Sequence, residues 1–235
     1  MKRKLGCSVL EAAQQRVRYA FDHFEKVYVS FSGGKDSSVL FHLSAEEARR
    51  RGRRLAVLVI DLEAQYELTI RHIEEMCDLY NDCIDLYWVC LPMKLRNAVS
   101  NYEPVWCAWD PDRKNDWVRQ PPKRNGVITE TSYFDFFTER MEFEEFVELF
   151  AAWYAGDSTV AALIGIRSDE SLNRWRTICR WEKETHCGKR WTTRVVNDVY
   201  NCYPIYDWHV TDIWKYHACF PRSEEHTSEL QSRFG

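Results

Sequence analysis

The stretch Val27-Tyr28-Val29-Ser30-Phe31-Ser32-Gly33-Gly34-Lys35-Asp36-Ser37-Ser38 decides the fold. Its first five residues are mostly β-branched or aromatic and predict a buried strand, and a helix is predicted from about Ser37 to near Gly52. The two glycines between them let the backbone turn sharply and approach an anion closely. The helix directs its free N–H groups and the positive end of its dipole to the same point. This arrangement predicts a phosphate-binding loop.

The loop also carries polar side chains that suit a nucleotide. Lys35 adds a mobile positive charge, and the serines on both sides of it add hydroxyl donors. The spacing does not fit G-x-x-x-x-G-K-(S/T), so this is not the loop of kinases and GTPases. An ordinary glycine turn is the alternative interpretation. The candidate nucleotide-binding residues are Ser32, Gly33, Gly34, Lys35, Asp36, Ser37 and Ser38.

Helical and strand patterns alternate along the rest of the chain. This alternation predicts an α/β fold with a doubly wound, mostly parallel sheet. Ser8 and Glu11 form a capping box at the start of a helix that precedes the first strand. Further strands are predicted at residues 55–60, 84–91 and 159–166, and a last helix at residues 210–219.

Residues 101–133 interrupt this alternation with four prolines, one glycine and three tryptophans. They predict a long insertion or lid without regular elements. The aromatic residues would either pack as a lid over the nucleotide or, together with neighbouring basic residues, stack on bases. Since no repeat or low-complexity linker is found, residues 1–221 are interpreted as one domain that includes this insertion.

The composition indicates a globular protein. The chain has 235 residues, of which 45% are hydrophobic and 29% charged, and its net charge is -4. These values exclude disordered and collagen-like proteins. No apolar run approaches the roughly 18 residues of a membrane span, so we expect a cytoplasmic protein with no membrane partner.

The nine cysteines contain no C-x-x-C pair. We therefore expect buried, reduced thiols, and neither a zinc site nor an iron–sulfur cluster formed by cysteine or histidine ligands. Cys179 and Cys187, on either side of His186, leave a metal site as the alternative.

Charged residues also follow two other predicted strands, where open α/β sheets bind ligands. Asp61 could bind ribose hydroxyls or magnesium together with Glu63, or it could cap the next helix. Arg167 could clamp a phosphate or sulfate, or form an ion pair with Asp169 or Glu170. Asp61, Glu63, Asp169 and Glu170 are therefore the candidate substrate or magnesium ligands.

The last residues, 222–235, lack apolar periodicity and resemble the translation of a sequencing-adapter oligonucleotide. We interpret them as an artefactual tail, with a native polar tail as the alternative. On the first interpretation the natural protein continues past Pro221, and the domain of residues 1–221 is truncated at its C-terminus.

Three segments resemble known families. Residues 32–37, S-G-G-K-D-S, resemble the S-G-G-x-D-S loop of the ATP-pyrophosphatase (PP-loop) superfamily, whose members cleave ATP between the α and β phosphates and transfer AMP. Residues 204–214, P-I-Y-D-W-H-V-T-D-I-W, resemble a segment of the phosphoadenosine phosphosulfate (PAPS) reductase family. We expect these residues to have a packing role. Residues 165–174, G-I-R-S-D-E-S-L-N-R, resemble a bacterial subgroup that carries the names PAPS sulfotransferase and co-activator of prophage gene expression.

The resemblance implies a Rossmann-like PP-loop fold that binds ATP with Mg²⁺, or PAPS as a substrate. Lys35, Asp36 and Arg167 would then be catalytic. Lys35 would hold the β and γ phosphates, Arg167 would neutralise an attacking oxyanion such as sulfate, and Asp36 would orient magnesium or lock the loop. The E-C-G-x-H motif of the reductases is missing from the sequence, and residues 186–188, H-C-G, are expected to form a surface turn. Thiol-based reduction is therefore not expected, and the intact loop is more similar to the small subunit of ATP sulfurylase.

Two classes of function stay open. The first is an enzyme of sulfur metabolism, either a nucleotidyltransferase or a sulfonucleotide transferase or reductase. The second is a nucleotide-gated regulator or accessory subunit with a protein partner, and an enzyme like those of DNA phosphorothioate modification lies between them.

An arginine cluster near the end of the first predicted βα helix is interpreted either as a solvated helix end or as a nucleic-acid surface. The negative net charge of the chain argues against nucleic acid. The cluster consists of Arg49, Arg50, Arg51, Arg53 and Arg54.

Overall fold

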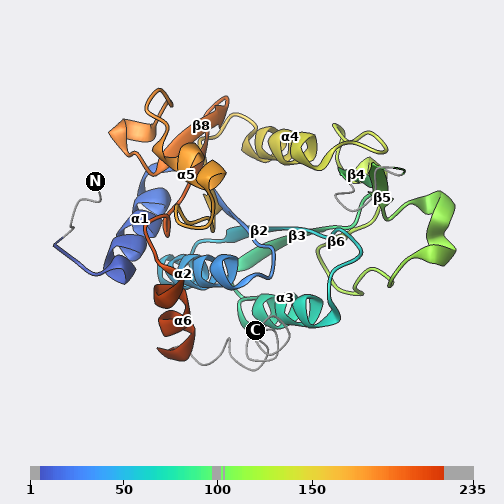
Figure 1. Ribbon diagram of the computed structural model, residues 1–235, viewed down its shortest axis with the longest axis horizontal. Coiled ribbons are helices and arrows are strands. Elements are labelled where there is room, and N and C mark those ends of the chain that lie inside the picture. The colour runs from blue at the N-terminus through green and yellow to red at the C-terminus, as the bar shows by residue number, and fades with distance from the viewer. Residues whose placement is uncertain (1–5, 97–101, 103, 220–235) are drawn as a thin grey trace.

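The computed structural model describes residues 6–96, 102 and 104–219 and shows a seven-stranded sheet flanked by helices (Figure 1). The strand order is β6-β3-β2-β1-β7-β9-β8, and each neighbouring pair is parallel except β8 with β9. The strands are β1 (Lys26–Ser30), β2 (Leu55–Ile60), β3 (Ile84–Val89), β6 (Val127–Ile128), β7 (Val160–Ile164), β8 (Thr192–Val196) and β9 (Val199–Cys202). A separate antiparallel pair consists of β4 (Met93–Arg96) and β5 (Val105–Ala108).

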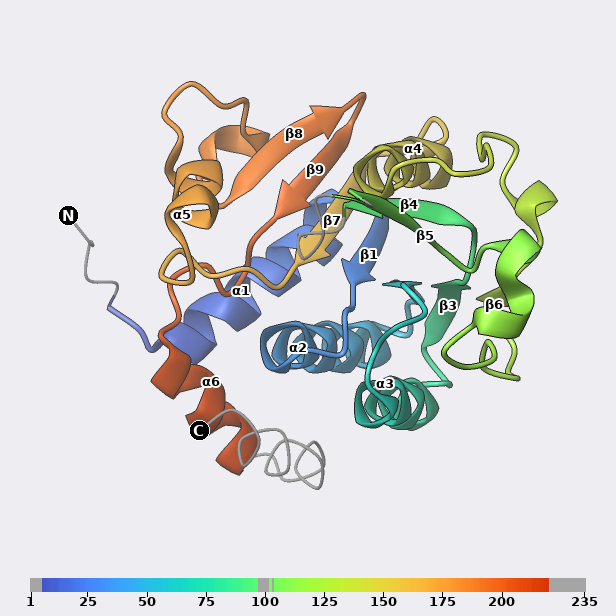
Figure 2. The same cartoon turned by 45° about the vertical axis from the view of Figure 1, so that its right-hand side comes forward.

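Helices cover both faces of the sheet, which confirms the doubly wound, mostly parallel α/β fold. Helices α1 (Val9–His23), α2 (Lys35–Arg51) and α3 (Glu67–Leu79) share one apolar cluster with one face, and α6 (Val210–Cys219) packs on α2. Helix α4 (Phe143–Ala155) belongs to a second cluster on the opposite face (Figure 2). The remaining helices are α5 (Leu172–Cys179) and three short 3-10 turns, η1 (Pro111–Asp116), η2 (Thr131–Tyr133) and η3 (His186–Gly188).

Strand β1 shows why helices pack on both faces of this sheet. Val27 and Val29 belong to the cluster that α1 and α2 share, whereas Tyr28 between them belongs to the cluster of α4. Successive side chains of a strand point to opposite faces, so an uninterrupted apolar run must be buried on both sides. The central position of β1 follows from its composition, and it places the loop after residue 31 at the middle of the sheet edge.

Several predicted boundaries are confirmed. Strand β2 and helix α6 have the predicted bounds, Ser8 and Glu11 form the predicted capping box, and α2 ends at Gly52 in a left-handed conformation (φ 61°). Helix α2 begins at Lys35, two residues earlier than predicted, with Gly34 as its N-cap. The loop itself is therefore shorter and tighter than its sequence indicates.

The prediction that residues 101–133 lack regular elements is wrong. Residues 105–108 form β5 of the antiparallel pair, and β6 extends the main sheet beside β3. Gly126 makes the second pairing possible: its φ is +89°, and a Cβ there would lie 2.6 Å from the Leu86 carbonyl oxygen. Two and four residues are too few to show a strand pattern in a sequence. The predicted tail, 222–235, and Pro221 lie outside the described residues.

Within the described residues no helix is long and apolar enough to cross a membrane. All nine cysteines are free thiols. The expectation that they are buried is wrong for part of the set, since Cys179, Cys187 and Cys219 are exposed and Cys7 and Cys107 are partly exposed. Cys179 and Cys219 lie on helices α5 and α6, and Cys187 lies in the turn η3. Their side chains face solvent.

Candidate functional site

The loop of residues 32–38 lies where the connections of the sheet change direction. Strand β1 has β2 on one side and β7 on the other, so the segments that follow β1 and β7 meet at the carboxyl edge between them. Crevices of this kind are the usual ligand sites of open α/β sheets. The structure therefore brings the predicted loop next to the predicted segment 165–170.

Glycines allow this approach. Gly33 has a φ of +73°, and a Cβ there would lie 2.8 Å from Thr69 Cγ2 on α3. A Cβ on Gly165, at the end of β7, would lie 2.9 Å from Ser37 Cα, so only a glycine lets β7 run this close to α2. No side chain caps the first turn of α2, whose leading N–H groups have no acceptor within the helix. These features fit the phosphate-binding loop that the sequence predicts, and its role in binding stays a prediction.

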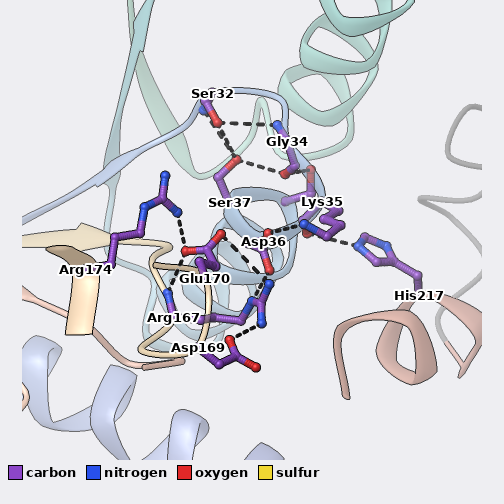
Figure 3. A network of polar contacts seen from close by, with 11 residues as sticks. Ser32, Gly34, Lys35, Asp36, Ser37, Arg167, Asp169, Glu170, Arg174 and His217 are labelled. Atoms are coloured by element: carbon purple, nitrogen blue, oxygen red, sulfur yellow. Dashed lines mark hydrogen bonds and ion pairs between the residues drawn. The ribbon is translucent and has the colours of Figure 1, made fainter. Parts of the chain in front are cut away.

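The serine hydroxyls hold the loop in shape. Ser37 Oγ and Ser38 Oγ both donate to the Gly34 carbonyl oxygen, at 2.9 and 3.0 Å. Ser32 Oγ lies 3.0 Å from Ser37 Oγ and accepts a longer bond of 3.4 Å from the Gly34 N–H (Figure 3). The predicted hydroxyl donors are thus engaged in holding the loop together.

Asp36 and Arg167 form the centre of the site (Figure 3). Asp36 accepts from Arg167 Nε at 2.5 Å and from Lys35 Nζ at 2.7 Å. Arg167 is only 4% exposed, and its guanidinium also pairs with Asp169 and lies 3.9 Å from Glu170. Both ion pairs predicted as the alternative for Arg167 are present, and the pair with Asp36 was not predicted. Asp36 therefore ties the loop to the end of β7.

The charges in this centre are balanced. Asp36, Asp169 and Glu170 face Lys35 and Arg167, and Arg174 on α5 pairs with Glu170 as well. Among the described residues no three His, Cys, Asp or Glu side chains are grouped to hold a metal ion. Asp169 and Glu170, two of the predicted substrate or magnesium ligands, pair with Arg167 and Arg174 here. Their role toward magnesium stays a prediction.

Two histidines support the loop from outside it, and the sequence did not indicate them. His217 Nε2 on α6 donates to the Lys35 carbonyl oxygen at 3.0 Å. His72 Nε2 on α3 lies 2.8 Å from Ser38 Oγ. Both come from helices that pack beside α2 only in the folded chain. His217 lies ten residues after Asp207, and its sequence position alone does not show that it reaches the loop.

Asp61 and Glu63 have different surroundings from Asp36. The Asp61 side chain is fully buried and accepts from Trp88 Nε1 at 2.8 Å, from the Glu63 N–H at 2.9 Å and from Arg119. Glu63 accepts the backbone N–H groups of Trp109 and Val118, at 2.7 and 3.0 Å. Both carboxylates thus hold the insertion against the end of β2.

The alternative in which Asp61 caps the next helix is wrong, because Tyr66 is the N-cap of α3. Cys90 beside Asp61 is not an available nucleophile: burial raises the pKa of its thiol, and the Asp61 charge raises it further. Residues 186–188 form a short 3-10 turn with an exposed Cys187, as expected of a surface turn.

The segment 204–214 has the expected packing role. Trp208 is 2% exposed and its Nε1 donates to the Val9 carbonyl oxygen at 3.1 Å, while Asp207 forms a bidentate ion pair with Arg16 on α1. This segment starts α6, which carries His217 to the loop. The motif therefore contributes to the site indirectly.

Comparison with known proteins identifies the family of this chain. Residues 26–219 match the phosphoadenosine phosphosulfate reductase domain family. The uncharacterized protein YbdN of Escherichia coli (strain K12) is 43% identical over 217 residues, which cover 91% of this chain and 52% of YbdN, so the chain spans about half the length of that relative. A crystal structure of phosphoadenylyl-sulfate (PAPS) reductase from Candida auris, in complex with phosphate, has 13% identity and a TM-score of 0.47, covering 92% of this chain and 88% of that one. The family match extends over most of the sequence, and the chain belongs to the phosphoadenosine phosphosulfate reductase domain family.

Proposed function

We propose that this protein binds an adenine nucleotide at residues 32–38 and cleaves ATP between its α and β phosphates, transferring AMP to an oxyanion such as sulfate. The observation that supports the proposal best is the uncapped start of α2 beside two glycines, with Arg167 held 2.5 Å from Asp36 at the same edge of the sheet. Such an edge offers N–H donors for phosphates and a guanidinium for an acceptor anion in one place.

The proposed reaction is an in-line displacement. An oxygen of the acceptor attacks the α phosphorus, and the bond between that phosphorus and the α–β bridging oxygen breaks. Pyrophosphate leaves with the electron pair, stabilised by the loop N–H groups and Lys35. Magnesium carried on the phosphates would supply further positive charge, and no residue of this chain is assigned to it.

Arg167 has to change partners in this scheme. Its guanidinium is shared among Asp36, Asp169 and Glu170, of which Asp169 has a 32% exposed side chain. An incoming oxyanion can replace Asp169, since that carboxylate is solvated when released. Asp36 keeps Arg167 aimed at the loop during the exchange, so we assign Asp36 a positioning role.

The first test is thermal unfolding with magnesium and ATP, GTP or PAPS. A ligand at 100 times its dissociation constant adds about 2.7 kcal/mol of stability. An ATP-selective shift that disappears in Gly34→Asp supports the proposed site, because that substitution places a carboxylate in the proposed phosphate-binding loop. A shift with PAPS alone would replace ATP by the sulfonucleotide as substrate, and no shift with any nucleotide would overturn the proposal.

The second test is pyrophosphate release from ATP with and without sulfate. Arg167→Lys keeps the charge and loses the planar fork, so we expect turnover to fall at least about tenfold with sulfate present, equivalent to about 1.4 kcal/mol on the barrier. Circular dichroism checks that the variant is folded. ATP binding without pyrophosphate release in the parent protein would instead support a nucleotide-gated regulator.

A further inference from the structure

A cationic region lies beside the site, and the proposed reaction makes no use of it. Residues 172–194, which we call the basic lobe, run from α5 through η3 to β8. They contain seven lysines and arginines and two glutamates, a net charge of +5 in a chain whose total is -4. Figure 2 shows α5 and the chain after it beside β8, at the edge of the sheet opposite β6.

Large aromatic side chains of the basic lobe face solvent. Trp175 is 49% exposed and Trp181 is 82% exposed. Of the eight residues of α5 only Ile178 is buried, and Leu172, Trp175 and Arg176 share a face at three- and four-residue spacing. A helix this short is marginal without tertiary packing, and it buries little of its surface here. This exposed face is therefore available to a partner.

The cations of the basic lobe are incompletely neutralised. Arg174 and Arg194 have carboxylate partners, whereas no ion pair of Arg176 or Arg180 occurs within the described residues. Lys183 Nζ is buried without a hydrogen-bond partner there, and burial, with a smaller contribution from Arg190, lowers the pKa of Lys183 to about 8. These groups create a positive potential that an anionic ligand would relieve.

One arginine of the basic lobe packs on an exposed indole ring. The Arg190 guanidinium lies 4.6 Å from the Trp181 ring centroid, and its Nη2 donates to the Arg180 carbonyl oxygen at 3.1 Å. This contact holds an arginine on one face of the indole and leaves most of the ring exposed. Exposed aromatic rings among arginines are typical of surfaces that stack unpaired bases and contact the phosphates between them.

We propose that the basic lobe binds a single-stranded nucleic acid, with bases stacked on Trp175 and Trp181 and phosphates contacted by Arg176 and Arg180. A duplex keeps its base faces covered and cannot stack them on the two exposed indoles. The interaction is independent of nucleotide turnover at residues 32–38. The Arg49–Arg54 cluster is a poorer candidate, because each of its arginines is already paired with a carboxylate or with backbone carbonyl oxygens.

Fluorescence anisotropy of the whole chain with a labelled oligonucleotide of about 16 nucleotides tests this proposal. Single-stranded DNA and RNA of one sequence form two arms, and a duplex and heparin form two others. We expect single strands to bind in preference to the duplex, with quenching of tryptophan fluorescence and an affinity that falls with salt. Trp181→Ala should weaken binding about tenfold, and Trp181→Phe should restore most of it because a ring remains.

A matched pair of arginine substitutions distinguishes binding by the basic lobe from a general effect of net charge. Arg180→Ala should weaken binding and reduce the slope of log affinity against log salt by about 0.7. Arg54→Ala removes the same charge from a residue paired with Asp85 at 2.7 Å, and should leave binding unchanged. Equal binding of heparin and oligonucleotides with no effect of Trp181→Ala would overturn the proposal, as would binding of polyglutamate without binding of any oligonucleotide.

Discussion

Two neighbouring strand ends at the same edge of the sheet carry aspartates, and their surroundings differ. Asp36 follows β1 and contacts Lys35, whose side chain is 32% exposed, and Arg167, which contacts two further carboxylates. Asp61 follows β2 and has no exposed side-chain surface, with Trp88, Arg119 and the Glu63 N–H as its partners. The first carboxylate lies in an ion-pair network that solvent reaches, and the second lies in a closed structural junction.

The difference shows what makes a strand end suitable for ligands. Ion pairs at the border with solvent can exchange partners at low cost, because a released carboxylate is hydrated. A buried carboxylate cannot release its cation without leaving a charge in a medium of low dielectric constant. The strand end at β2 anchors the insertion, and the strand end at β1 is the one at which we propose ligand binding.

Asp61→Ala should show the largest effect on stability. It leaves the Arg119 guanidinium without a counter-charge and Trp88 Nε1 without an acceptor, so we expect the free energy of unfolding to fall by about 3–5 kcal/mol. Urea denaturation measures this loss. Asp169→Ala is the matched control on the other side of the comparison and should cost less than about 1 kcal/mol. Similar losses for the two variants would contradict the distinction between the two strand ends.

Gly33→Ala should have the next largest effect. The substitution puts a Cβ 2.8 Å from Thr69 Cγ2 in a backbone with φ of +73°, and we expect a loss of about 2–4 kcal/mol. Gly34 is the control, because its φ is -78° and the nearest atom to an added Cβ is Ser32 Oγ at 3.4 Å. Gly34→Ala should change stability by less than about 0.5 kcal/mol. Thermal or urea unfolding of the pair checks this difference, which would be absent if α3 moved aside freely.

Trp88→Phe tests the junction without removing a charge. Phenylalanine keeps an aromatic ring in the core but loses the indole N–H that donates to Asp61 Oδ2 at 2.8 Å. We expect a loss of about 1–3 kcal/mol, smaller than that of Asp61→Ala because Arg119 still faces the carboxylate. Combining both substitutions in a double-mutant cycle should give a total below the sum of the separate losses. Strict additivity would show that the two side chains act independently.

Long apolar segments made most of the fold predictable from the sequence. Strand β2 is six consecutive buried or nearly buried apolar residues, and its predicted bounds are the observed ones. The hairpin of β8 and β9 was missed although Asn197-Asp198 separates two runs rich in Val, Thr and Tyr, and Asn197 has the positive φ of 46° typical of such turns. The turn residues indicate a hairpin, but the two strands are too short and too polar to show a clear strand pattern in the sequence.

The site was predictable only where a contiguous segment forms it. Residues 32–38 are adjacent in the chain, so their sequence indicates their geometry. The contact of Asp36 with Arg167 joins residues 131 positions apart, and its existence depends on β7 pairing with β1. Asp61 directly follows a predicted strand, as a ligand-binding residue would. Only the fold shows that Arg119 from the insertion pairs with it.

Lys35→Ala should have the smallest effect on stability and a large one on function. The Lys35 side chain is one third exposed and pairs with Asp36, which retains Arg167, so the free energy of unfolding should change by less than about 0.5 kcal/mol. The same substitution removes the only flexible cation of residues 32–38, and pyrophosphate release should fall at least about tenfold, or about 1.4 kcal/mol. Lys215→Ala, at an exposed lysine of α6, is the control for loss of one positive charge. A strand end that binds ligands should show this separation of function from stability, whereas a stability loss in Lys35→Ala like that of Asp61→Ala would make both strand ends structural.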